Sequence, residues 1–371
     1  MPDVVILGGG IIGCSVAYQL AKRGARVCVL DPGEIGAQAS SAAVGALAPM
    51  KLFARRDNPL LALQLKSLAL FPDVLQEIEQ LTGHSCEYQQ SGAVRLARAT
   101  ERARVAAWVD EWREELFMHV KEREEIREQE GALDASSSLA VFIPAEAQVR
   151  ASAYMRAVAL AARRAGATLS GETRIQEVIS CGARVRAVRT DAGTIPCDAL
   201  LLAAGAWSGQ VGELLGLRLP VRPMAGQAIE MAQPPLPIRH LLFGEGVYIV
   251  PKSDTTLYIG ATQEDMGFTP HVQATGVVRL GKKASRLVPA LASLPVKRAW
   301  VGLRPTTPDH RPILGKAPGW ENVTIATGHG GFGVLLSVIT GMTIADLIAT
   351  GRLPAILRPF LPERFAADTP S

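Results

Sequence analysis

Hydrophobic residues at the start of the chain form two short runs that flank a glycine cluster. The first run, Val4 to Leu7, leads into Gly8-Gly-Gly10, and the second, Ala25 to Leu30, ends at Asp31. Short, continuously apolar runs are typical of strands buried on both faces of a parallel sheet, and glycine clusters mark turns. The pattern therefore predicts a strand, a glycine turn, a helix and a second strand.

Farther along, blocks of helical and of strand-like hydrophobicity follow one another. Apolar residues at helical spacing predict helices from Leu60 to Thr82 and from Ala151 to Ala165, and charged helical sequence extends from Glu101 to Glu130. A long final helix ends near Thr350. Alternating or continuously apolar runs predict strands at Ala93–Leu96, Ile175–Ile179, Arg184–Thr190, Thr194–Pro196, Leu200–Trp207, Leu219–Met231, Val247–Val250, Leu257–Gly260, Lys297–Leu303 and Val323–Gly328.

The order of these blocks predicts an α/β fold with two interleaved domains. Sequence typical of a Rossmann-like nucleotide-binding domain occurs at the start, in the middle and at the end of the chain. Sequence typical of an antiparallel sheet separates these parts. We therefore assign residues 1–83, 151–217 and 304–371 to the nucleotide-binding domain, and residues 84–150 and 218–303 to a substrate domain.

The stretch from Val4 to Ala21 has a second interpretation, because its eighteen residues carry no charge. That length meets the requirement for a membrane span or for the core of a signal peptide. The glycines at Gly8 to Gly10 and at Gly13 would make a poor helix, however, and the preceding Met1-Pro2-Asp3 is not basic. We therefore favour the strand–turn–helix interpretation and expect no membrane partner.

Composition and charge narrow the class of protein. Of the 371 residues, 48% are hydrophobic and 35 are glycine, which is the profile of a folded α/β enzyme. The net charge of +4 is spread along the chain, with a mixed-sign cluster from Arg113 to Glu130, so no nucleic-acid partner is expected. The five cysteines are scattered without metal-ligand spacing, which predicts no metal site and a reducing, cytoplasmic location.

The first glycine turn has the spacing of a dinucleotide-binding motif. Gly8 permits the tight turn, Gly10 lets the backbone approach a pyrophosphate, and Gly13 lets the helix pack on the strand. The phosphates bind at the helix N-terminus, where free N–H groups and the helix dipole favour negative charge. Asp31 is placed to accept a hydrogen bond from a ribose 2′-OH and would repel a 2′-phosphate, which argues against NADP.

A second glycine-rich turn, Thr327 to Gly333, again lies between a predicted strand and a helix. A second helix N-terminus calls for a second electron-rich group, and a flavin supplies one in the negative charge that develops at N1–C2=O on reduction. A nicotinamide cofactor would need only the first turn. His329 has two interpretations, as a catalytic base or as a residue that caps the backbone, and we favour the second.

Two segments rich in small residues are candidates for close ligand contact. Gln38 to Pro49 follows the first predicted strand–helix–strand unit and has no strong helical pattern. Ala203 to Ser208 follows a buried strand, and it fits equally a ligand contact at the edge of the sheet or a simple strand-to-helix turn.

Two polar side chains are candidates for binding a carboxylate. Arg304 ends an apolar strand, where its guanidinium is suited to a bidentate contact; the alternative is a surface ion pair with Asp309. Tyr248 lies on a strand whose Val247 and Ile249 point the other way. Its hydroxyl either reaches the same carboxylate or the ring fills the core.

Together, these motifs resemble the D-amino acid oxidase superfamily of FAD-dependent oxidoreductases, and most closely its glycine oxidase branch. The resemblance covers nearly the whole chain. It rests on Gly8-Gly-Gly-Ile-Ile-Gly13 with Asp31, Ser40-Ser-Ala-Ala43 with Gly45, Leu202-Ala-Ala-Gly-Ala-Trp-Ser208, Tyr248-Ile-Val-Pro251 with Gly260-Ala-Thr262, and Gly302-Leu-Arg-Pro305 with Asp309, Pro312 and Gly315.

The resemblance implies a Rossmann-like FAD-binding domain of the glutathione-reductase type, interleaved with an antiparallel-sheet substrate domain. It implies non-covalent FAD, a substrate carboxylate bound by Arg304 and Tyr248, and an adenine-side contact at Ile175. Segments Ser41 to Gly45 and Gly330 to Val334 are assigned to the flavin ring. The implied cofactor-binding residues are Gly8, Gly10, Ile11, Ile12, Gly13, Asp31, Ser40, Ser41, Ala42, Ala43, Gly45, Ile175, Ala204, Gly205, Trp207, Arg304, His329, Gly330, Gly331, Phe332, Gly333 and Val334.

The implied reaction is the oxidation of glycine or of another small amine or amino acid. Hydride passes from the substrate to flavin N5 without an essential side-chain base, the imine gives an oxo acid and ammonia, and O2 is reduced to H2O2. A homo-oligomer and a role in thiamine biosynthesis through glycine imine are also expected. Two alternatives remain: a dehydrogenase of D-amino acids, sarcosine or proline with a non-oxygen acceptor, and a non-catalytic flavin-binding subunit.

Two positions depart from the glycine oxidase pattern. Gly330-Gly-Phe332 stands where an additional arginine is often found, and Gly246 stands where a bulkier polar residue is found. With a single guanidinium in the pocket, the substrate stays open between glycine, an N-alkyl glycine, a D-amino acid and a larger amine. It is also open whether Met50, Lys51 or Arg55 gates the site.

Overall fold

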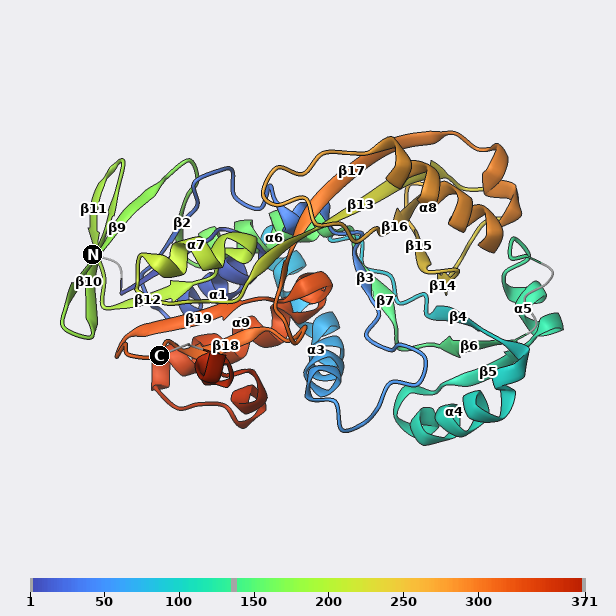
Figure 1. Cartoon of the computed structure of the whole chain (residues 1–371), viewed down its shortest axis with the longest axis horizontal. Coiled ribbons are helices and arrows are strands. Elements are labelled where there is room, and N and C mark those ends of the chain that lie inside the picture. The colour runs from blue at the N-terminus through green and yellow to red at the C-terminus, as the bar shows by residue number, and fades with distance from the viewer. Residues whose placement is uncertain (1–2, 135–138, 369–371) are drawn as a thin grey trace.

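The structure is a computed structural model that describes residues 3–134 and 139–368, and its two large sheets lie side by side along the long axis of the molecule (Figure 1). The first sheet has six strands in the order β18-β19-β12-β1-β2-β8. Neighbouring strands run parallel except β18 and β19. The strands are β1 Val4–Leu7, β2 Val27–Leu30, β8 Thr168–Ser170, β12 Ala199–Leu202, β18 Ile313–Lys316 and β19 Val323–Thr327.

Both faces of this sheet are covered, which explains its continuously apolar strands. Val4 and Ile6 point to a helical layer, whereas Val5 and Leu7 point to the opposite side. The helical layer consists of α1 Ile11–Ala21, α3 Pro59–Thr82, α6 Ala151–Arg164 and α9 Gly333–Thr350. The opposite side packs against a three-stranded antiparallel sheet of β9 Ile175–Cys181, β10 Arg184–Thr190 and β11 Gly193–Pro196.

Helix α9 is the most apolar of these helices. The segment Gly330–Thr350 has the length and composition of a membrane-crossing helix, and 67% of its most apolar window is buried inside the structure. It packs against α1 and α3 in the helical layer. The same burial is what a core helix of a folded domain requires.

The second sheet has eight strands in the order β17-β13-β16-β15-β14-β4-β6-β5. One of its faces packs on helix α8 Ala274–Leu287, and the other faces the junction with the first sheet. Figure 1 shows the long strands β13 and β17 reaching toward that junction. The strands are β4 Ala93–Ala97, β5 His119–Glu122, β6 Leu139–Ile143, β13 Arg222–Ala232, β14 Leu241–Gly244, β15 Val247–Pro251, β16 Thr256–Gly260 and β17 Val296–Thr306.

Short elements from three segments of the chain lie at the junction between the sheets. The one-turn helix α2 Ala39–Ala42 contacts α6 and β17. Strand β3 Ala46–Leu47 pairs with β7 Ala147–Gln148. Helix α7 Ser208–Glu213 follows a 3₁₀ turn, Gly205–Trp207, that contacts β13 and β17. The two segments rich in small residues, Gln38 to Pro49 and Ala203 to Ser208, therefore lie at this junction. Both were candidates for close ligand contact.

The expected helical sequence from Glu101 to Glu130 is wrong at its centre. Helix α4 Arg102–Leu116 ends at Phe117, whose φ of +50° is left-handed, and α5 begins only at Arg123 and ends at Gln129. Between them, β5 adds an edge strand to β6. The sequence of β5, His-Val-Lys-Glu, is polar because one side of an edge strand faces water. Hydrophobic periodicity therefore did not indicate this strand.

Other boundaries shift for similar reasons. The strand expected from Leu200 to Trp207 ends at Leu202, because the chain turns into the 3₁₀ turn at Gly205, whose φ is +54°. Strands β6 and β14 and helix α8 were not expected from the sequence. The fold class is confirmed as α/β with a Rossmann-like layer and a largely antiparallel second sheet. The five-segment division of the chain stays a prediction, and β17 crosses its boundary at residues 303 and 304.

Candidate active site

The glycine turn between β1 and α1 has no space for a side chain at two of its positions, Gly8 and Gly13. Gly8 has φ +116°, and a Cβ on it would overlap the backbone carbonyl of Ala203. A Cβ on Gly13 would overlap the carbonyl oxygen of Gly8, so α1 packs directly on the turn. Gly10 is open instead, because its Cβ would meet only the Ser40 hydroxyl, at 3.1 Å. The turn thus has the exposed backbone that a bound pyrophosphate needs.

Ser40 and Asp31 both hydrogen-bond to this turn. The Ile11 N–H donates to Ser40 Oγ at 2.9 Å, which ties α2 to the start of α1. Asp31 accepts from the Gly9 N–H at 2.7 Å and from the Gly33 N–H at 2.9 Å, one bond on each carboxylate oxygen. The structural role of Asp31 was not expected; its predicted ribose contact stays a prediction, since each oxygen keeps a second acceptor site.

Two other predicted cofactor contacts lie close to these residues. Ile175 begins β9, and the nearby Thr173 N–H donates to the Asp31 carbonyl oxygen at 2.9 Å, so the adenine-side candidate lies next to the end of β2. The side chains of Ile11 and Ile12 are only 4% and 8% exposed. Their side chains are therefore buried, and the Ile11 N–H already donates to Ser40 Oγ, so the predicted cofactor contacts at these two residues stay predictions.

Helix α2 and its extension pack tightly between the two sheets. Trp300 Nε1 on β17 donates to the Ala42 carbonyl oxygen at 2.8 Å, and a Cβ on Gly302 would lie 2.8 Å from the Ala42 Cβ. Gly45 has φ +89°, and its Cβ would overlap the carbonyl oxygen of Val149. The segment from Ser40 to Gly45 therefore lies against both the glycine turn and the second, eight-stranded sheet.

The 3₁₀ turn after β12 lies beside the same junction. Thr327 Oγ1 donates to the Gly205 carbonyl oxygen at 3.2 Å and lies 2.6 Å from Ser208 Oγ, which connects this turn to the end of β19. The Trp207 ring contacts Phe268, with ring centres 5.7 Å apart. Hydrogen bonds therefore connect this turn to the neighbouring strand β19. The predicted cofactor contact at Ala204, Gly205 and Trp207 remains a prediction.

Arg304 and Tyr248 come together from separate strands, β17 and β15. Arg304 Nη1 donates to the Thr262 carbonyl oxygen at 3.0 Å, and its guanidinium covers Gly226, where a side chain would collide with it. Burial raises the pKa of the Tyr248 hydroxyl, and the Arg304 guanidinium beside it offsets part of that rise. The phenol is therefore neutral at ordinary pH and available as a hydrogen-bond donor.

The ion pair considered for Arg304 is contradicted, whereas both interpretations of Tyr248 stay open, because its ring packs against a hydrophobic cluster. Asp309 pairs with Arg364 at 2.8 Å rather than with Arg304. Val247 and Ile249 pack in the cluster with α8, while Tyr248 lies on the opposite face, stacked on Phe243 with ring centres 5.8 Å apart. Strand alternation thus turns Tyr248 toward the junction, and the tertiary fold brings Arg304 to it.

His329 does not present its side chain to this site. It is 4% exposed, and Nε2 lies 3.2 Å from Thr340 Oγ1 inside α9. Burial lowers its pKa to about 3, so the ring is neutral. His329 therefore fits neither interpretation: a ring kept neutral by burial is no catalytic base, and its side chain makes no capping hydrogen bond to the turn that it begins. Only its backbone remains for a cofactor contact.

The second glycine turn is close to the carboxylate candidates. A Cβ on Gly331 would lie 3.7 Å from Arg304 Cδ and Nε. Gly330 has φ +55°, and Gly333 begins α9. Val334 is 7% exposed and packs in the helical core, so its side chain points away from the junction.

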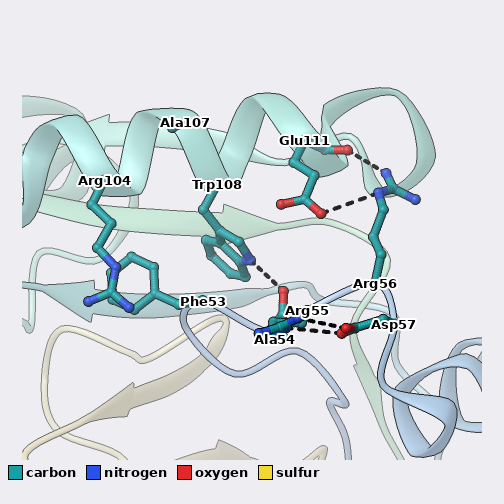
Figure 2. Close-up of a pocket in the computed structure, with 9 residues that line it drawn as sticks. All are labelled: Phe53, Ala54, Arg55, Arg56, Asp57, Arg104, Ala107, Trp108 and Glu111. Carbon is teal, nitrogen blue, oxygen red and sulfur yellow. Dashed lines mark hydrogen bonds and ion pairs between the residues drawn. The ribbon is translucent and has the colours of Figure 1, made fainter.

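The loop after Pro49 is anchored at several points rather than free. The Met50 N–H donates to Glu146 Oε1 at 2.8 Å, and Trp108 Nε1 donates to the Ala54 carbonyl oxygen at 3.1 Å (Figure 2). Lys51 Nζ lies 5.8 Å from the centre of the Phe332 ring. Of the three gate candidates, Met50 is buried, Arg55 pairs with Asp57, and Lys51 approaches the second glycine turn.

A pocket of about 500 Å³ lies between this loop and α4. Figure 2 shows the residues that line it. None of the predicted cofactor or substrate residues lines it. It is lined by Phe53, Ala54, Arg55, Arg56, Asp57, Arg104, Ala107, Trp108 and Glu111.

Three buried charged residues near the junction were not expected from the sequence. Arg95 and Glu146 are 5% and 0% exposed and form an ion pair at 2.7 Å, and Lys252 is 5% exposed. The available signal was a charged residue within or directly after an apolar strand, at Arg95 and at Lys252. In residues 3–134 and 139–368, no group of three or more His, Cys, Asp or Glu side chains could hold a metal ion.

Comparisons with known proteins agree with this geometry. The FAD dependent oxidoreductase family, DAO, matches residues 3–347. Glycine oxidase of Geobacillus kaustophilus is 35% identical over 96% of each chain, and the glycine oxidase crystal structure from that organism superposes with a TM-score of 0.90 over 97% of this chain and 98% of its own.

Two further relatives carry other names. The bifunctional protein ThiO/ThiG of Trichormus variabilis is 35% identical over 99% of this chain, which spans only 56% of that protein. The hydrogen cyanide synthase subunit HcnC of Pseudomonas aeruginosa is 32% identical over 99% of this chain and 97% of its own length. The match to the family model, over nearly the whole chain, and the turn that fits a pyrophosphate lead to one conclusion: this chain belongs to the DAO family of FAD-dependent oxidoreductases and is an FAD-dependent enzyme that oxidises amino acids.

Proposed function

We propose that this enzyme oxidises glycine or another small amino acid whose carboxylate is held by Arg304 and Tyr248. The observation that carries the proposal is the approach of the Arg304 guanidinium to the neutral Tyr248 hydroxyl at the junction of the two sheets. A guanidinium binds a carboxylate through two parallel N–H···O bonds, and a phenol donates a further one.

The side chains act by positioning. With its carboxylate held at Arg304, a substrate as small as glycine has little rotational freedom left, and restricting that freedom lowers the barrier to reaction. FAD, when bound, supplies the two-electron acceptor for the oxidation. His329 is neutral and held by Thr340, so it supplies no base, and the substrate reacts as its neutral amine. The released imine hydrolyses to an oxo acid and ammonia.

We propose that O2 reoxidises the flavin and gives H2O2. The alternative, a dehydrogenase with a non-oxygen acceptor, predicts reduction of an added dye without peroxide. A non-catalytic subunit is the third possibility, and it draws support from the name of the relative HcnC. The Arg304–Tyr248 pair favours catalysis, because a subunit without a reaction needs no group to hold a carboxylate.

The remaining parts of the proposal follow the resemblance. The cofactor is held non-covalently by the residues assigned above, with phosphates at Gly10 and the flavin ring near Ser41 to Gly45. The name of the relative ThiO/ThiG supports a role in thiamine biosynthesis. By the resemblance, that role is a supply of glycine imine by a cytoplasmic homo-oligomer.

A second candidate substrate is an amine with a second carboxylate. Lys51 favours it, because this cation lies 5.8 Å from the Phe332 ring and forms no ion pair among the residues that the structure describes. Gly331 adds no side chain between Phe332 and Arg304. Iminodiacetate carries one carboxylate for each cation, so it should be a better substrate than sarcosine, and Lys51→Met should remove that preference.

The test is anaerobic mixing of the holoenzyme with glycine, sarcosine, iminodiacetate, D-alanine and D-proline. The expected result is bleaching of the flavin absorbance by glycine or by an N-substituted glycine, followed by peroxide release when air is admitted. Bleaching only by D-alanine or D-proline would contradict the glycine assignment. If no amino acid bleaches the flavin, the non-catalytic subunit is the better description.

A further inference from the structure

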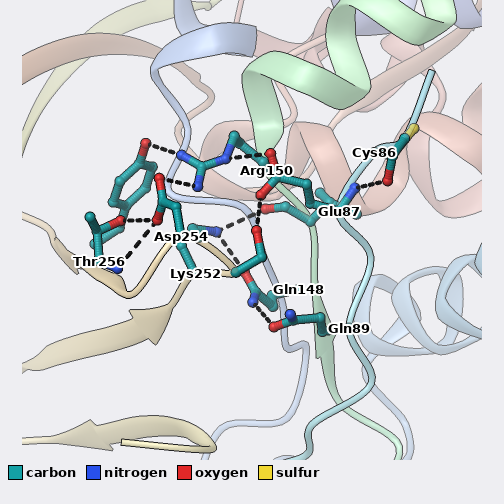
Figure 3. A network of polar contacts seen from close by, with 12 residues as sticks. Cys86, Glu87, Gln89, Gln148, Arg150, Lys252, Asp254 and Thr256 are labelled. Atoms are coloured by element: carbon teal, nitrogen blue, oxygen red, sulfur yellow. Dashed lines mark hydrogen bonds and ion pairs between the residues drawn. The ribbon is translucent and has the colours of Figure 1, made fainter. Parts of the chain in front are cut away.

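Lys252 is a buried lysine whose amino group is fully hydrogen-bonded. It follows the end of β15, its side chain is 5% exposed, and Nζ donates to three oxygens: Gln148 Oε1 at 2.7 Å, Val44 O at 2.8 Å and Val149 O at 2.9 Å. An ammonium group has three N–H donors, so each finds one acceptor. Figure 3 shows Lys252 at the centre of this polar network.

These three acceptors belong to separate parts of the junction. Val44 lies between α2 and β3, in the segment assigned to the flavin ring, while Gln148 and Val149 lie at the end of β7. The Val149 N–H also donates to the Gly45 carbonyl oxygen at 2.9 Å. Lys252 thus joins the flavin-side segment and β7 to the strand that carries Tyr248.

Among the residues that the structure describes, no carboxylate forms an ion pair with Lys252. The two neighbouring carboxylates instead form ion pairs with Arg150, Glu87 at 2.7 Å and Asp254 at 2.8 Å. Arg150 also donates a hydrogen bond to the Tyr258 hydroxyl at 2.7 Å. Burial, together with the Arg150 charge, lowers the pKa of Lys252 to about 7, and Glu87 and Asp254 oppose that shift. A cation held by neutral oxygens is costly to bury, and a methionine of similar size would avoid that cost.

Trp300 makes the matching contact from the other strand. Its Nε1 donates to the Ala42 carbonyl oxygen at 2.8 Å, two residues before the carbonyl that Lys252 holds. Trp300 lies on β17 with Arg304, and Lys252 follows β15 with Tyr248. The strands that bear the two carboxylate-binding residues therefore each hold one carbonyl of the same short segment.

We propose that Lys252 is a positioning residue that, with Trp300, aligns the Ala42–Val44 backbone beside the flavin with the strands that carry Tyr248 and Arg304. The inference rests on the proposed function only in placing the flavin ring beside this segment. It requires no particular substrate, so its test reads the bound FAD directly.

The test compares Lys252→Met and Trp300→Phe with the wild type, using Lys282→Met on the exposed side of α8 as the control. Lys252→Met loses three hydrogen bonds, of which the one to Val44 anchors the segment, and Trp300→Phe loses the one to Ala42; both variants keep most of the side-chain volume. We expect a shifted visible absorption spectrum of the bound flavin in both, and a Kd for FAD raised about tenfold in Lys252→Met, since a charged hydrogen bond is lost. Lys282→Met should match the wild type. An unchanged spectrum and Kd in Lys252→Met, with only a lower Tm, would overturn the proposal and leave Lys252 a structural residue.

The wild type provides a second test if Lys252→Met does not fold. Above its pKa of about 7 the amino group has two N–H donors for three acceptors, so the flavin spectrum should change between pH 6 and pH 9. Lys252→Gln, which carries no titrating group, should lose that change. A spectrum that is flat with pH in the wild type, or one that changes equally in Lys252→Gln, would contradict the proposal.

Discussion

The two glycine-rich turns are similar in sequence but differ in what requires their glycines. In the first turn, a Cβ on Gly8 or Gly13 would overlap a backbone carbonyl, so the turn cannot form with any other residue. In the second, a Cβ on Gly331 would lie 3.7 Å from the Arg304 side chain, which is an ordinary contact. Gly8 and Gly13 are thus demanded by backbone packing, whereas Gly331 leaves room beside Arg304.

The largest expected effect comes from Gly13→Ala. The new methyl group would force α1 away from the glycine turn, so we expect an unfolding free energy lower by roughly 2 kcal/mol or more and little bound FAD. Thermal unfolding and the ratio of flavin to protein absorbance measure both. Gly281→Ala is the control, because Gly281 lies in α8 with open space around it and alanine should stabilise that helix by about 0.5–1 kcal/mol. A Gly13→Ala protein with full flavin content would show that the first turn tolerates a side chain.

Arg304→Ala should have the next largest effect. It should lower activity and leave FAD binding unchanged. Loss of the guanidinium removes the main partner of the substrate carboxylate, so kcat/KM should fall by roughly two to three orders of magnitude. FAD content should stay near that of the wild type. Lys297→Ala, an exposed cation on the same strand, should leave kcat/KM unchanged. Normal oxidation of glycine by Arg304→Ala would show that the carboxylate binds elsewhere.

Tyr248→Phe should act in the same direction but more weakly. It removes one neutral donor and keeps the ring stacked on Phe243, so we expect kcat/KM to fall about fivefold to tenfold, mainly through KM. Steady-state kinetics at several glycine concentrations separate KM from kcat. A wild-type KM would mean that the hydroxyl does not contact the substrate.

The smallest effect is expected for Gly331→Ala, and it sharpens the contrast between the turns. The methyl group fits beside Arg304, so stability should change by less than about 0.5 kcal/mol. Activity on glycine should stay within about threefold, because charged hydrogen bonds to the carboxylate are kept. Loss of flavin from Gly331→Ala would show that the second turn is as restricted as the first.

The pH dependence of the unfolding free energy gives an independent check on the burial of Lys252 at the junction of the two sheets. The folded pKa of Lys252, about 7, lies below its ordinary value of 10.5, so the unfolded chain binds more protons between these values. The unfolding free energy of the wild type relative to Lys252→Met should therefore rise as the pH rises from 6 to 9. Chemical denaturation at both pH values measures it, and a difference that falls with pH would contradict the assigned burial.

Sequence patterns predicted some elements well and others poorly, for a consistent physical reason. The β1–turn–α1 unit and the core helices α3 and α6 were predicted, because apolar runs and glycine spacing are local signals. Strand β5 was not, because a polar edge strand exists only through pairing with β6. The interior position of His329 was also missed, since nothing next to it in sequence reveals Thr340 as its partner.

The amino-acid sequence by itself determined the dinucleotide-binding turn, because contacts within a few residues set the backbone there. It also identified Arg304 and Tyr248 as residue types suited to a carboxylate. Only the tertiary structure decided that these two side chains lie next to each other, that Asp309 forms an ion pair with Arg364, and that Lys252 donates a hydrogen bond to the Val44 carbonyl oxygen. Those contacts join strands far apart in the chain, and their geometry depends on how the two sheets pack, which no local pattern encodes.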